Sequence, residues 1–296
     1  MQRTRVEPLV NTFSIVARDP ETGDLGIAVE SKFLAVGAVV PWARAGVGAV
    51  ATQAWANVTY GRRGLDLLAS GMSADEAVTE LTRDDDGRTR RQVGIVDAQG
   101  RAASFTGEEC NAWAGGVVGE GFCCQGNILV GPDVVDAMAD GYRTTSGSFA
   151  HRLLAALEGG QAAGGDSRGQ QSAAILVVRA SGGYGGGSDR YIDLRIDDHP
   201  QPIEELRRLV MLHRVYFRKD EADLVPLDSA LLSTLRGQLA ALGYLGSAED
   251  DTSIGAALAR FAGRENLEER LRGDGQIDTV ILEHLRARAA AAETEQ

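Results

Sequence analysis

The chain has 296 residues, of which 44% are hydrophobic and 24% charged, and its formal net charge is −12. This composition is that of a globular protein and excludes a disordered chain, while the acidity argues against sequence-independent nucleic-acid binding, which needs a basic face. No segment has the apolar length of a signal-peptide core or a membrane span, so we expect a cytoplasmic protein with no membrane partner.

Cysteine usage agrees with a reducing compartment. The three cysteines, Cys110, Cys123 and Cys124, are an odd number, and two of them are adjacent. None has zinc-ligand spacing to a histidine. The cysteines therefore predict neither a disulfide framework nor a zinc site.

Four closely spaced strands open the main domain. They are predicted at Thr12–Arg18, Leu25–Ser31, Val36–Ala45 and Val47–Gln53. Four strands before any helix indicate an antiparallel sheet rather than βαβ repeats. Two helices follow, one containing Tyr60 and Leu68 and one starting at Ser73, where Ser73 and Glu76 form a capping-box pattern.

Strands and helices then alternate in blocks. Strands are predicted at Arg90–Asp97, Arg101–Thr106 and Phe122–Gly126, helices at Val134–Met138 and Ser148–Leu157, further strands at Ser172–Arg179 and Tyr191–Ile196, and a helix from Pro202 toward Phe217. The residues from Asp97 to Gly100 are typical of a hairpin turn. Two sheets flanked by helices would bury every apolar face in this order of elements.

The composition changes after the helix that runs toward Phe217. Helices are predicted at Ser229–Leu242, Ile254–Phe261 and Thr279–Ala291, with no strand between them. The sequence thus predicts a main domain at residues 12–218 and a small all-α module at residues 228–291.

Five separated motifs in the main domain carry a family resemblance. They are Thr12–Asp19, Gly26–Phe33, Gln125–Leu129, Gly164–Ser172 and Asp193–Pro200. Together they resemble the domain of unknown function 1028 family, bacterial proteins grouped with the N-terminal-nucleophile (Ntn) hydrolases. The resemblance implies an α+β fold, an Ntn-hydrolase-like four-layer αββα sandwich. Leu235–Tyr244 resembles a peptidoglycan-binding-like module, which we expect to serve in interaction or oligomerisation because no export signal precedes it.

The resemblance also implies a reaction and its residues. Ntn hydrolases cleave amides with the side chain of an N-terminal Thr, Ser or Cys, whose own α-amine acts as base. An α-amine with a pKa near 7.7–8.0 is partly deprotonated at neutral pH, whereas a free lysine is not. Thr12 falls at the nucleophile position. Catalytic roles are also implied for Glu30, Ser31 and Lys32, and oxyanion roles for Gly48 and Asn127.

Two features depart from that pattern. Eleven residues precede Thr12, so its nitrogen is an amide unless the chain is cut after Asn11. Arg44 lies near the place of the second basic group of proteasome-like members, and a guanidinium cannot shuttle protons. Ser14, on the same strand face as Thr12, is the alternative nucleophile, and Thr12 could equally be only a strand-forming residue.

Substrate-binding candidates lie at two places. Gln53, Asn57 and Tyr60 follow the fourth strand, where side chains either point into a cleft or cap a helix. In the glycine-rich stretch before the next strand, Asp166 and Arg168 could pair or hold a carboxylate, with Ser172 close by. The glycine spacing there matches no nucleotide-binding motif.

The sequence leaves two functions open. One is hydrolysis of an amide bond in a small polar substrate, with no cofactor and no metal. The other is a non-catalytic binding or assembly role on the same scaffold. Asp193, Asp197, Asp198 and His199 could bind Mg²⁺ or Ca²⁺, but a lead-in to the next helix is the stronger interpretation. The many apolar residues of the helix from Leu206 to Phe217 predict a homo-oligomer, and the alternative is that they pack against the module from Asp228 onward in the same chain.

Overall fold

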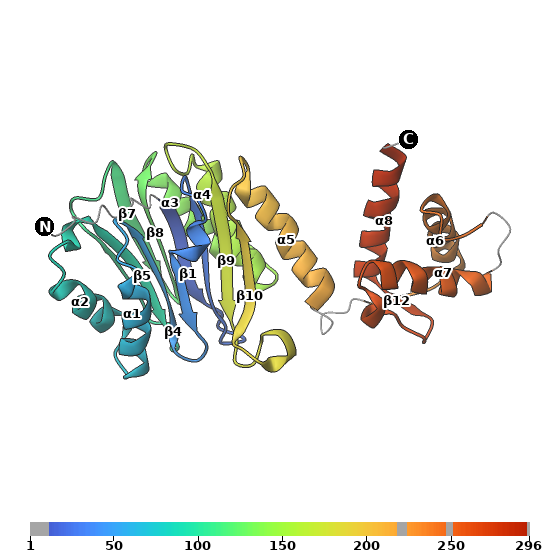
Figure 1. Cartoon of the computed structure of the whole chain (residues 1–296), viewed down its shortest axis with the longest axis horizontal. Coiled ribbons are helices and arrows are strands. Elements are labelled where there is room, and N and C mark those ends of the chain that lie inside the picture. The colour runs from blue at the N-terminus through green and yellow to red at the C-terminus, as the bar shows by residue number, and fades with distance from the viewer. Residues whose placement is uncertain (1–11, 218–223, 247–250, 295–296) are drawn as a thin grey trace, which may run out of the picture. The chain divides into compact units, whose positions relative to one another are not determined.

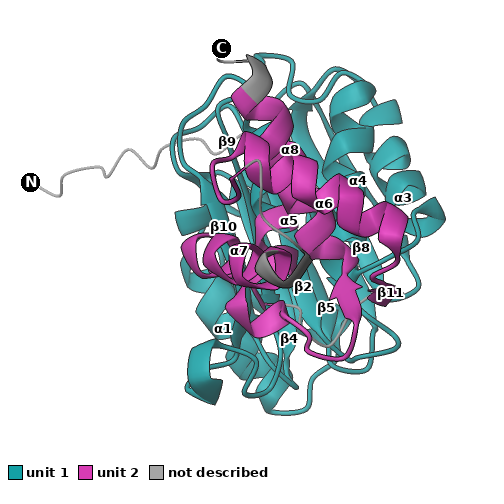
Figure 2. Cartoon of the chain, turned by 90° about the vertical axis from the view of Figure 1, so that its right-hand side faces the viewer, with its two compact units in different colours: residues 1–210 teal, residues 211–296 magenta. Residues whose placement is uncertain are grey.

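The computed structural model describes residues 12–217, 224–246 and 251–294. The chain divides into two compact units, residues 1–210 and 211–296, which Figure 2 shows in separate colours. The predicted α+β class, with antiparallel sheets and a helical C-terminal region, is confirmed. None of the described helices is long and apolar enough to cross a lipid bilayer.

A six-stranded sheet forms the centre of the first unit. Its order is β10-β9-β2-β1-β8-β7, with every neighbouring pair antiparallel. The strands are β1 (Thr12–Arg18), β2 (Leu25–Ser31), β7 (Trp113–Gly119), β8 (Phe122–Leu129), β9 (Ser172–Val178) and β10 (Arg190–Ile196). Strands β1, β2 and β9 are buried almost throughout, because both of their faces are covered.

A four-stranded antiparallel sheet faces the first one. Its order is β3-β4-β5-β6, and its strands are β3 (Pro41–Arg44), β4 (Gly48–Ala54), β5 (Arg91–Asp97) and β6 (Ala102–Thr106). The predicted hairpin between β5 and β6 is confirmed. Gly100 in its turn has a φ of +82°, a conformation that glycine adopts without a Cβ clash.

Helices cover the outer face of each sheet, as Figure 1 shows. Helices α1 (Thr59–Ala69) and α2 (Ala74–Arg83) pack on the four-stranded sheet, while α3 (Asp133–Thr144), α4 (Phe149–Ala162) and the start of α5 (Pro202–Phe217) pack on the six-stranded sheet. Between the sheets lies an apolar cluster that includes Val16, Ile27 and Ala51. Phe13 and Ile15 instead contact the helices, as the alternation of a strand requires.

Two expectations for unit 1 are wrong. The segment 36–45 is not one strand, because Val36–Ala38 is a 3₁₀ turn after Ala35, whose φ is +54°, and only Pro41–Arg44 is extended. Strand β7 was not expected at all. It contains three glycines, which have low strand propensity, and it forms only at the edge of the sheet against β8.

The second unit is helical with one small sheet. Its helices are α6 (Ser229–Ala241), α7 (Asp251–Arg264) and α8 (Thr279–Thr294). Strands β11 (Leu224–Pro226) and β12 (Gln276–Asp278) pair antiparallel, so the expectation of helices alone is wrong. Three-residue strands carry too little pattern to be recognised locally. The core includes Leu239, Phe261 and Leu285.

Candidate functional site

Thr12 is the first residue of β1, on the face that meets the second sheet. It pairs in register with Ser31, the last residue of β2, and the Thr12 Oγ1 donates a hydrogen bond to Ser31 Oγ at 3.1 Å. Both residues are fully buried. A neutral hydroxyl is a weak proton acceptor, so this contact orients the Thr12 hydroxyl but does not deprotonate it.

Two side-chain amides hold the backbone carbonyl of Thr12. Gln53 Nε2 donates to the Thr12 oxygen at 3.3 Å and Asn127 Nδ2 at 3.5 Å. The same two NH₂ groups each donate to Gln92 Oε1 at 2.9 Å. All three amides are buried. Asn127 therefore already uses both of its N–H groups within the protein, which disagrees with its expected role as a free oxyanion donor.

Gln92, on β5, was not singled out from the sequence. Its Nε2 donates to the carbonyl of Gly126 at 2.8 Å, to Thr106 Oγ1 at 2.9 Å and to the carbonyl of Gly115 at 3.2 Å. Gly126 and Gly115 belong to the six-stranded sheet. One side chain thus bridges the two sheets directly beside Thr12. No local pattern marks it, because all of its partners are distant in sequence.

Ser14, the alternative nucleophile, lies in the same buried layer. Its Oγ donates to Gln53 Oε1 at 2.6 Å and accepts from Gln125 Nε2 at 2.7 Å. Neither amide is a base. Space for the Gln125 amide depends on Gly94, where an added Cβ would lie 2.2 Å from Gln125 Oε1. Among the described residues, the side chains that hydrogen-bond to the hydroxyls of Thr12 and Ser14 thus include no base.

Backbone strain accompanies the two amides that contact Thr12. Ala54, directly after Gln53, has a φ of +62°, and Ile128, directly after Asn127, has a φ of +54°. Ile128 is also the extra residue of a β-bulge, since Leu129 and Asn127 oppose consecutive residues of β7. A β-branched residue in the left-handed region is unusual. Such strain persists where the surrounding structure determines it, and it concentrates at functional sites.

Glu30 does not join Thr12. Its cross-strand neighbours, Phe13 and Ala173, belong to the core that faces the helices. Glu30 is fully buried, and neither carboxylate oxygen accepts a hydrogen bond from a described residue. Burial, and then the charge of Asp166, raise its pKa well above the usual range. The expected role of Glu30 beside the Thr12 hydroxyl is therefore wrong, because neighbouring strand residues face opposite ways.

Lys32, Asp166 and Arg168 lie near Glu30 rather than near Thr12. Asp166 pairs with Arg168 through contacts of 2.7 and 3.0 Å, and its Oδ2 also accepts from the Lys32 N–H at 3.4 Å. Lys32 Nζ donates to the carbonyl of Gln170 at 3.0 Å. The Asp166 side chain is fully buried, whereas that of Arg168 is 36% exposed. This ion pair shapes the glycine-rich loop.

Ser172 and Gly48 have structural explanations. Ser172 Oγ donates to the carbonyl of Phe33 and accepts from the Val36 N–H at 3.0 Å, which holds the turn after β2. Gly48 is at the far end of β4 from Gln53, about 16 Å away at ~3.3 Å per residue. An added Cβ there would lie 2.3 Å from Leu68 Cδ1. The structure thus places Gly48 away from Thr12, contrary to its expected oxyanion role.

Asn57 and Tyr60 converge on Asp85, a residue that the sequence did not highlight. Tyr60 Oη donates to Asp85 Oδ2 at 2.7 Å, Asn57 Nδ2 at 3.2 Å and Arg91 Nε at 3.0 Å. Burial alone would raise the pKa of Asp85, but the hydrogen bonds from Arg91, Tyr60, Gly87 and Asn57 hold it well below its usual range. Burial and Asp85 raise the pKa of Tyr60. The hydrogen bonds to Asp85 anchor the loop between α2 and β5, because the polar side chains in this group are partners of one another.

The aspartates near His199 do not form a metal site. Asp193 pairs with Arg195 at 2.8 Å and with Arg190, while Asp198 accepts from Gln171 Nε2 at 3.0 Å. Across residues 12–217, 224–246 and 251–294, no group of three or more His, Cys, Asp or Glu side chains is arranged to hold a metal ion. Arg190 and Arg195 thus supply the opposite charges beside Asp193.

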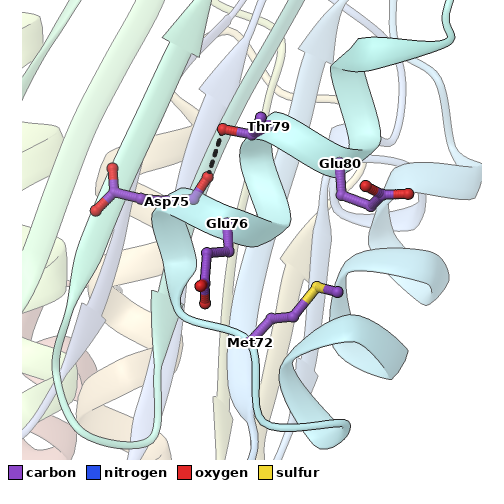
Figure 3. A pocket seen from close by; sticks show the side chains of 5 residues that line it. All are labelled: Met72, Asp75, Glu76, Thr79 and Glu80. Atoms are coloured by element: carbon purple, nitrogen blue, oxygen red, sulfur yellow. Dashed lines mark hydrogen bonds between the residues drawn. The ribbon is translucent and has the colours of Figure 1, made fainter.

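One surface hollow of about 390 Å³ lies at helix α2, away from Thr12 (Figure 3). It is lined by Met72, Asp75, Glu76, Thr79 and Glu80. Glu76 completes the predicted capping box by accepting from the Ser73 N–H at 2.7 Å, and Thr79 Oγ1 donates to the Asp75 carbonyl at 2.9 Å. These contacts stabilise the helix and supply no reacting group.

Comparison with known proteins finds one matching family model in the main domain and another in the C-terminal region. Residues 12–206 match the model described as "Family of unknown function (DUF1028)", and residues 216–285 match "Putative peptidoglycan binding domain". The crystal structure of protein SPO2555 from Silicibacter pomeroyi, a DUF1028 protein, is similar with a TM-score of 0.65 and 35% sequence identity, over 73% of this chain and 92% of that one. No curated protein matches the chain.

Proposed function

This chain belongs to the DUF1028 family, and on that premise we propose that it is an Ntn-type amide hydrolase with Thr12 as its nucleophile. One observation carries the proposal. Thr12 begins β1, a central strand of the six-stranded sheet, on the face toward the four-stranded sheet. Ser31 orients its hydroxyl, and Gln53 and Asn127 hold its carbonyl. Any buried threonine needs partners for its hydroxyl and carbonyl, so the support comes from where these contacts lie: at the start of β1, the nucleophile position in the family resemblance.

The proposed reaction requires a free amine at Thr12. The Thr12 hydroxyl first attacks the carbonyl of Asn11, a residue outside the described ranges, and the C–N bond between the two residues breaks, which leaves an ester on Oγ1 and a free amine on Thr12. Water then hydrolyses the ester, which releases residues 1–11 and restores the hydroxyl. In the mature protein this amine takes the hydroxyl proton as Oγ1 attacks the substrate carbonyl. The proton then passes to the leaving amine, and water hydrolyses the acyl-enzyme. An α-amine has the pKa that such a base needs at neutral pH.

The proposal changes the expected roles of several residues. Ser31 orients the nucleophile. Gln53 positions Thr12 instead of binding the substrate, and Asn127 positions Thr12 instead of binding the oxyanion. Glu30 lies on the other face of the sheet, whereas Lys32, Asp166 and Arg168 shape the loop after α4. The proposed substrate class is unchanged: the amide bond of a small polar substrate.

A non-catalytic role on the same scaffold is the second candidate. The observation in its favour is that both N–H groups of Asn127 and the Nε2 of Gln53 and Gln92 already have partners within the chain. A site whose donors are all satisfied resembles a structural polar layer. In that case the chain would remain intact at Thr12.

Intact-mass spectrometry with N-terminal sequencing separates the two candidates. For the wild type we expect loss of residues 1–11 and a free amine on Thr12. Thr12→Ser should be cut as well, and Thr12→Ala should keep its full length. A wild-type chain that stays intact while it hydrolyses an amide, or cutting of Thr12→Ala at the same place, contradicts the assignment. An intact and inactive wild type supports the non-catalytic role.

A further inference from the structure

The amide groups around the Thr12 carbonyl can adopt only one orientation. The Gly126 carbonyl, 2.8 Å from Gln92 Nε2, can only accept a hydrogen bond, so the NH₂ end of Gln92 must face it. Gln92 Oε1 then faces the opposite way, and it accepts from both Gln53 and Asn127. Asn127 Nδ2 also donates to the Thr12 carbonyl, and Gln53 Nε2 also donates to the carbonyls of Thr12 and Gln125, each at 3.3 Å. If the amide of Gln92, Gln53 or Asn127 were flipped, two acceptors or two donors would face each other and a hydrogen bond would be lost.

From this geometry we propose that Gln92 is a positioning residue for Thr12, acting through the amides of Gln53 and Asn127. The inference rests on the proposed role of Thr12 as nucleophile. We call these three amides the Thr12 clamp. Gln92 does not touch the Thr12 hydroxyl and is therefore not a catalytic residue in this scheme.

The clamp holds the backbone carbonyl of Thr12 and thereby the position of the residue that carries the reacting groups. Holding the carbonyl from two sides restricts rotation about the Cα–C bond, which sets the direction of the chain at the end of β1. The hydroxyl is oriented separately by Ser31. The α-amine and Oγ1 of one residue must keep a reactive geometry, and loss of such positioning commonly lowers the rate by about 100-fold.

Backbone strain supports the clamp independently of the hydrogen bonds. The left-handed residues Ala54 and Ile128 immediately follow Gln53 and Asn127. The left-handed region is unfavourable for any residue with a Cβ. A polar layer that only filled space between the sheets would not need strain at both donors. Strain at these two positions is explained when their side chains must be aimed at one carbonyl.

Two substitutions at Gln92 separate positioning from simple bridging of the sheets. Gln92→Glu, as the neutral acid, keeps an acceptor oxygen toward Gln53 and Asn127 and offers one O–H donor toward Gly126 in place of the NH₂ group, whereas Gln92→Met removes both ends. Thr106→Val is the matched control, because Thr106 contacts only the donor end of Gln92. Thermal unfolding of each purified full-length chain shows that it folds.

The readout is labelling of Thr12 by a β-lactone, followed by mass spectrometry. Oγ1 attacks the lactone carbonyl, the ring C–O bond breaks, the released alkoxide takes the proton held by the amine, and the chain gains the whole mass of the probe. We expect Gln92→Glu and Thr106→Val to label within about threefold of wild type and Gln92→Met to label about 10- to 100-fold more slowly. Gln92→Met at the wild-type rate, or Gln92→Glu as slow as Gln92→Met, overturns the inference.

A second variant and a structure keep the test decisive. If Gln92→Met does not fold, Asn127→Ala removes one arm of the clamp, and labelling at the wild-type rate would overturn the inference. If wild type and Thr12→Ala label alike, the proposed function fails. The inference is then judged from the crystal structure of Gln92→Met or, if that variant does not fold, of Asn127→Ala. A displaced Thr12 carbonyl supports the clamp, and an unmoved one refutes it.

Discussion

Glu30 and Ser31 are adjacent in β2, yet their side chains lie on opposite faces of the six-stranded sheet. Ser31 contacts Thr12 between the sheets, whereas Glu30 is buried on the helix side near Asp166. The alternation of a strand separates two polar groups that are next to each other in sequence. It also creates a buried carboxyl group without a hydrogen-bond donor, which has consequences for stability.

Glu30→Gln should stabilise the protein above acidic pH. The folded-state pKa of Glu30 is raised, so the wild type is most stable below the unfolded-state value near 4.3 and loses stability as pH rises toward the folded-state pKa. The slope of this loss is about 1.4 kcal/mol per pH unit. Urea unfolding at pH 5 and pH 8 should show this loss in the wild type and a smaller one in Glu30→Gln.

Glu21→Gln is the matched control for this prediction, because Glu21 is exposed in the turn after β1. It should retain the wild-type pH dependence. If the stability of Glu30→Gln to urea depends on pH as strongly as that of the wild type, the ionisation of Glu30 is not the cause of the pH dependence.

Asp85→Ala should destabilise unit 1. The substitution leaves the Arg91 guanidinium, whose side chain is 12% exposed, without its carboxylate. Loss of one partner of a largely buried pair costs about 3 kcal/mol. Tyr60→Phe removes one of the hydrogen bonds to Asp85 and should cost about 1 kcal/mol. Urea unfolding at pH 7 measures both changes.

Asp84→Ala is the control, since the Asp84 side chain is 80% exposed and should contribute little. The pH dependence gives a further check. Because the folded-state pKa of Asp85 is lowered, its stabilising effect is present above the unfolded value near 3.9 and is lost as pH falls below it. Equal stability of wild type and Asp85→Ala at pH 7 would contradict the anchoring role.

Gly94→Ala should disturb the buried polar layer. The new Cβ would lie 2.2 Å from Gln125 Oε1, so the amide must move away and lose its hydrogen bond to Ser14. Overpacking of this kind costs about 1–3 kcal/mol. If the clash is the cause, Gly94→Ala combined with Gln125→Ala should be less destabilised than the sum of the single variants. Additive effects in this double-mutant cycle would show that the clash with Gln125 is not the cause.

Gly237→Ala provides the opposite control in the same denaturation assay. Gly237 lies inside α6 with open space around its Cα, so alanine should stabilise this helix by up to about 1 kcal/mol.

Arg270→Met should destabilise the second unit strongly. Arg270 pairs with Asp278 at 2.5 Å and donates to the carbonyls of Val215 and Arg214, and its side chain is only 2% exposed. Removing it leaves a buried carboxylate and two carbonyls without this donor, at a cost of about 3–5 kcal/mol. Limited proteolysis with mass spectrometry should show faster cleavage within residues 211–296. Arg272→Met, in an exposed pair with Asp274, should leave the cleavage rate unchanged.

Local sequence signals determined most of the elements. The Ser73–Glu76 capping box, the turn at Gly100 and the apolar runs of β1 and β2 each depend on residues only a few positions apart, so their structure could be predicted without the fold. The family motifs likewise led to Thr12 and Ser31. Strand β7 and the short strands β11 and β12 were missed, because pairing with a distant strand forms them and their own composition does not.

Tertiary structure alone decided which polar residues share a site. Gln92 reaches Gln53, Asn127 and Gly126 only because two sheets stack face to face, and no spacing along the chain encodes that contact. Register decided that Ser31 meets Thr12 while Glu30 does not, since a shift of one residue would exchange their faces. Side-chain chemistry can be read from a sequence, but its direction and its partners depend on pairing between distant strands.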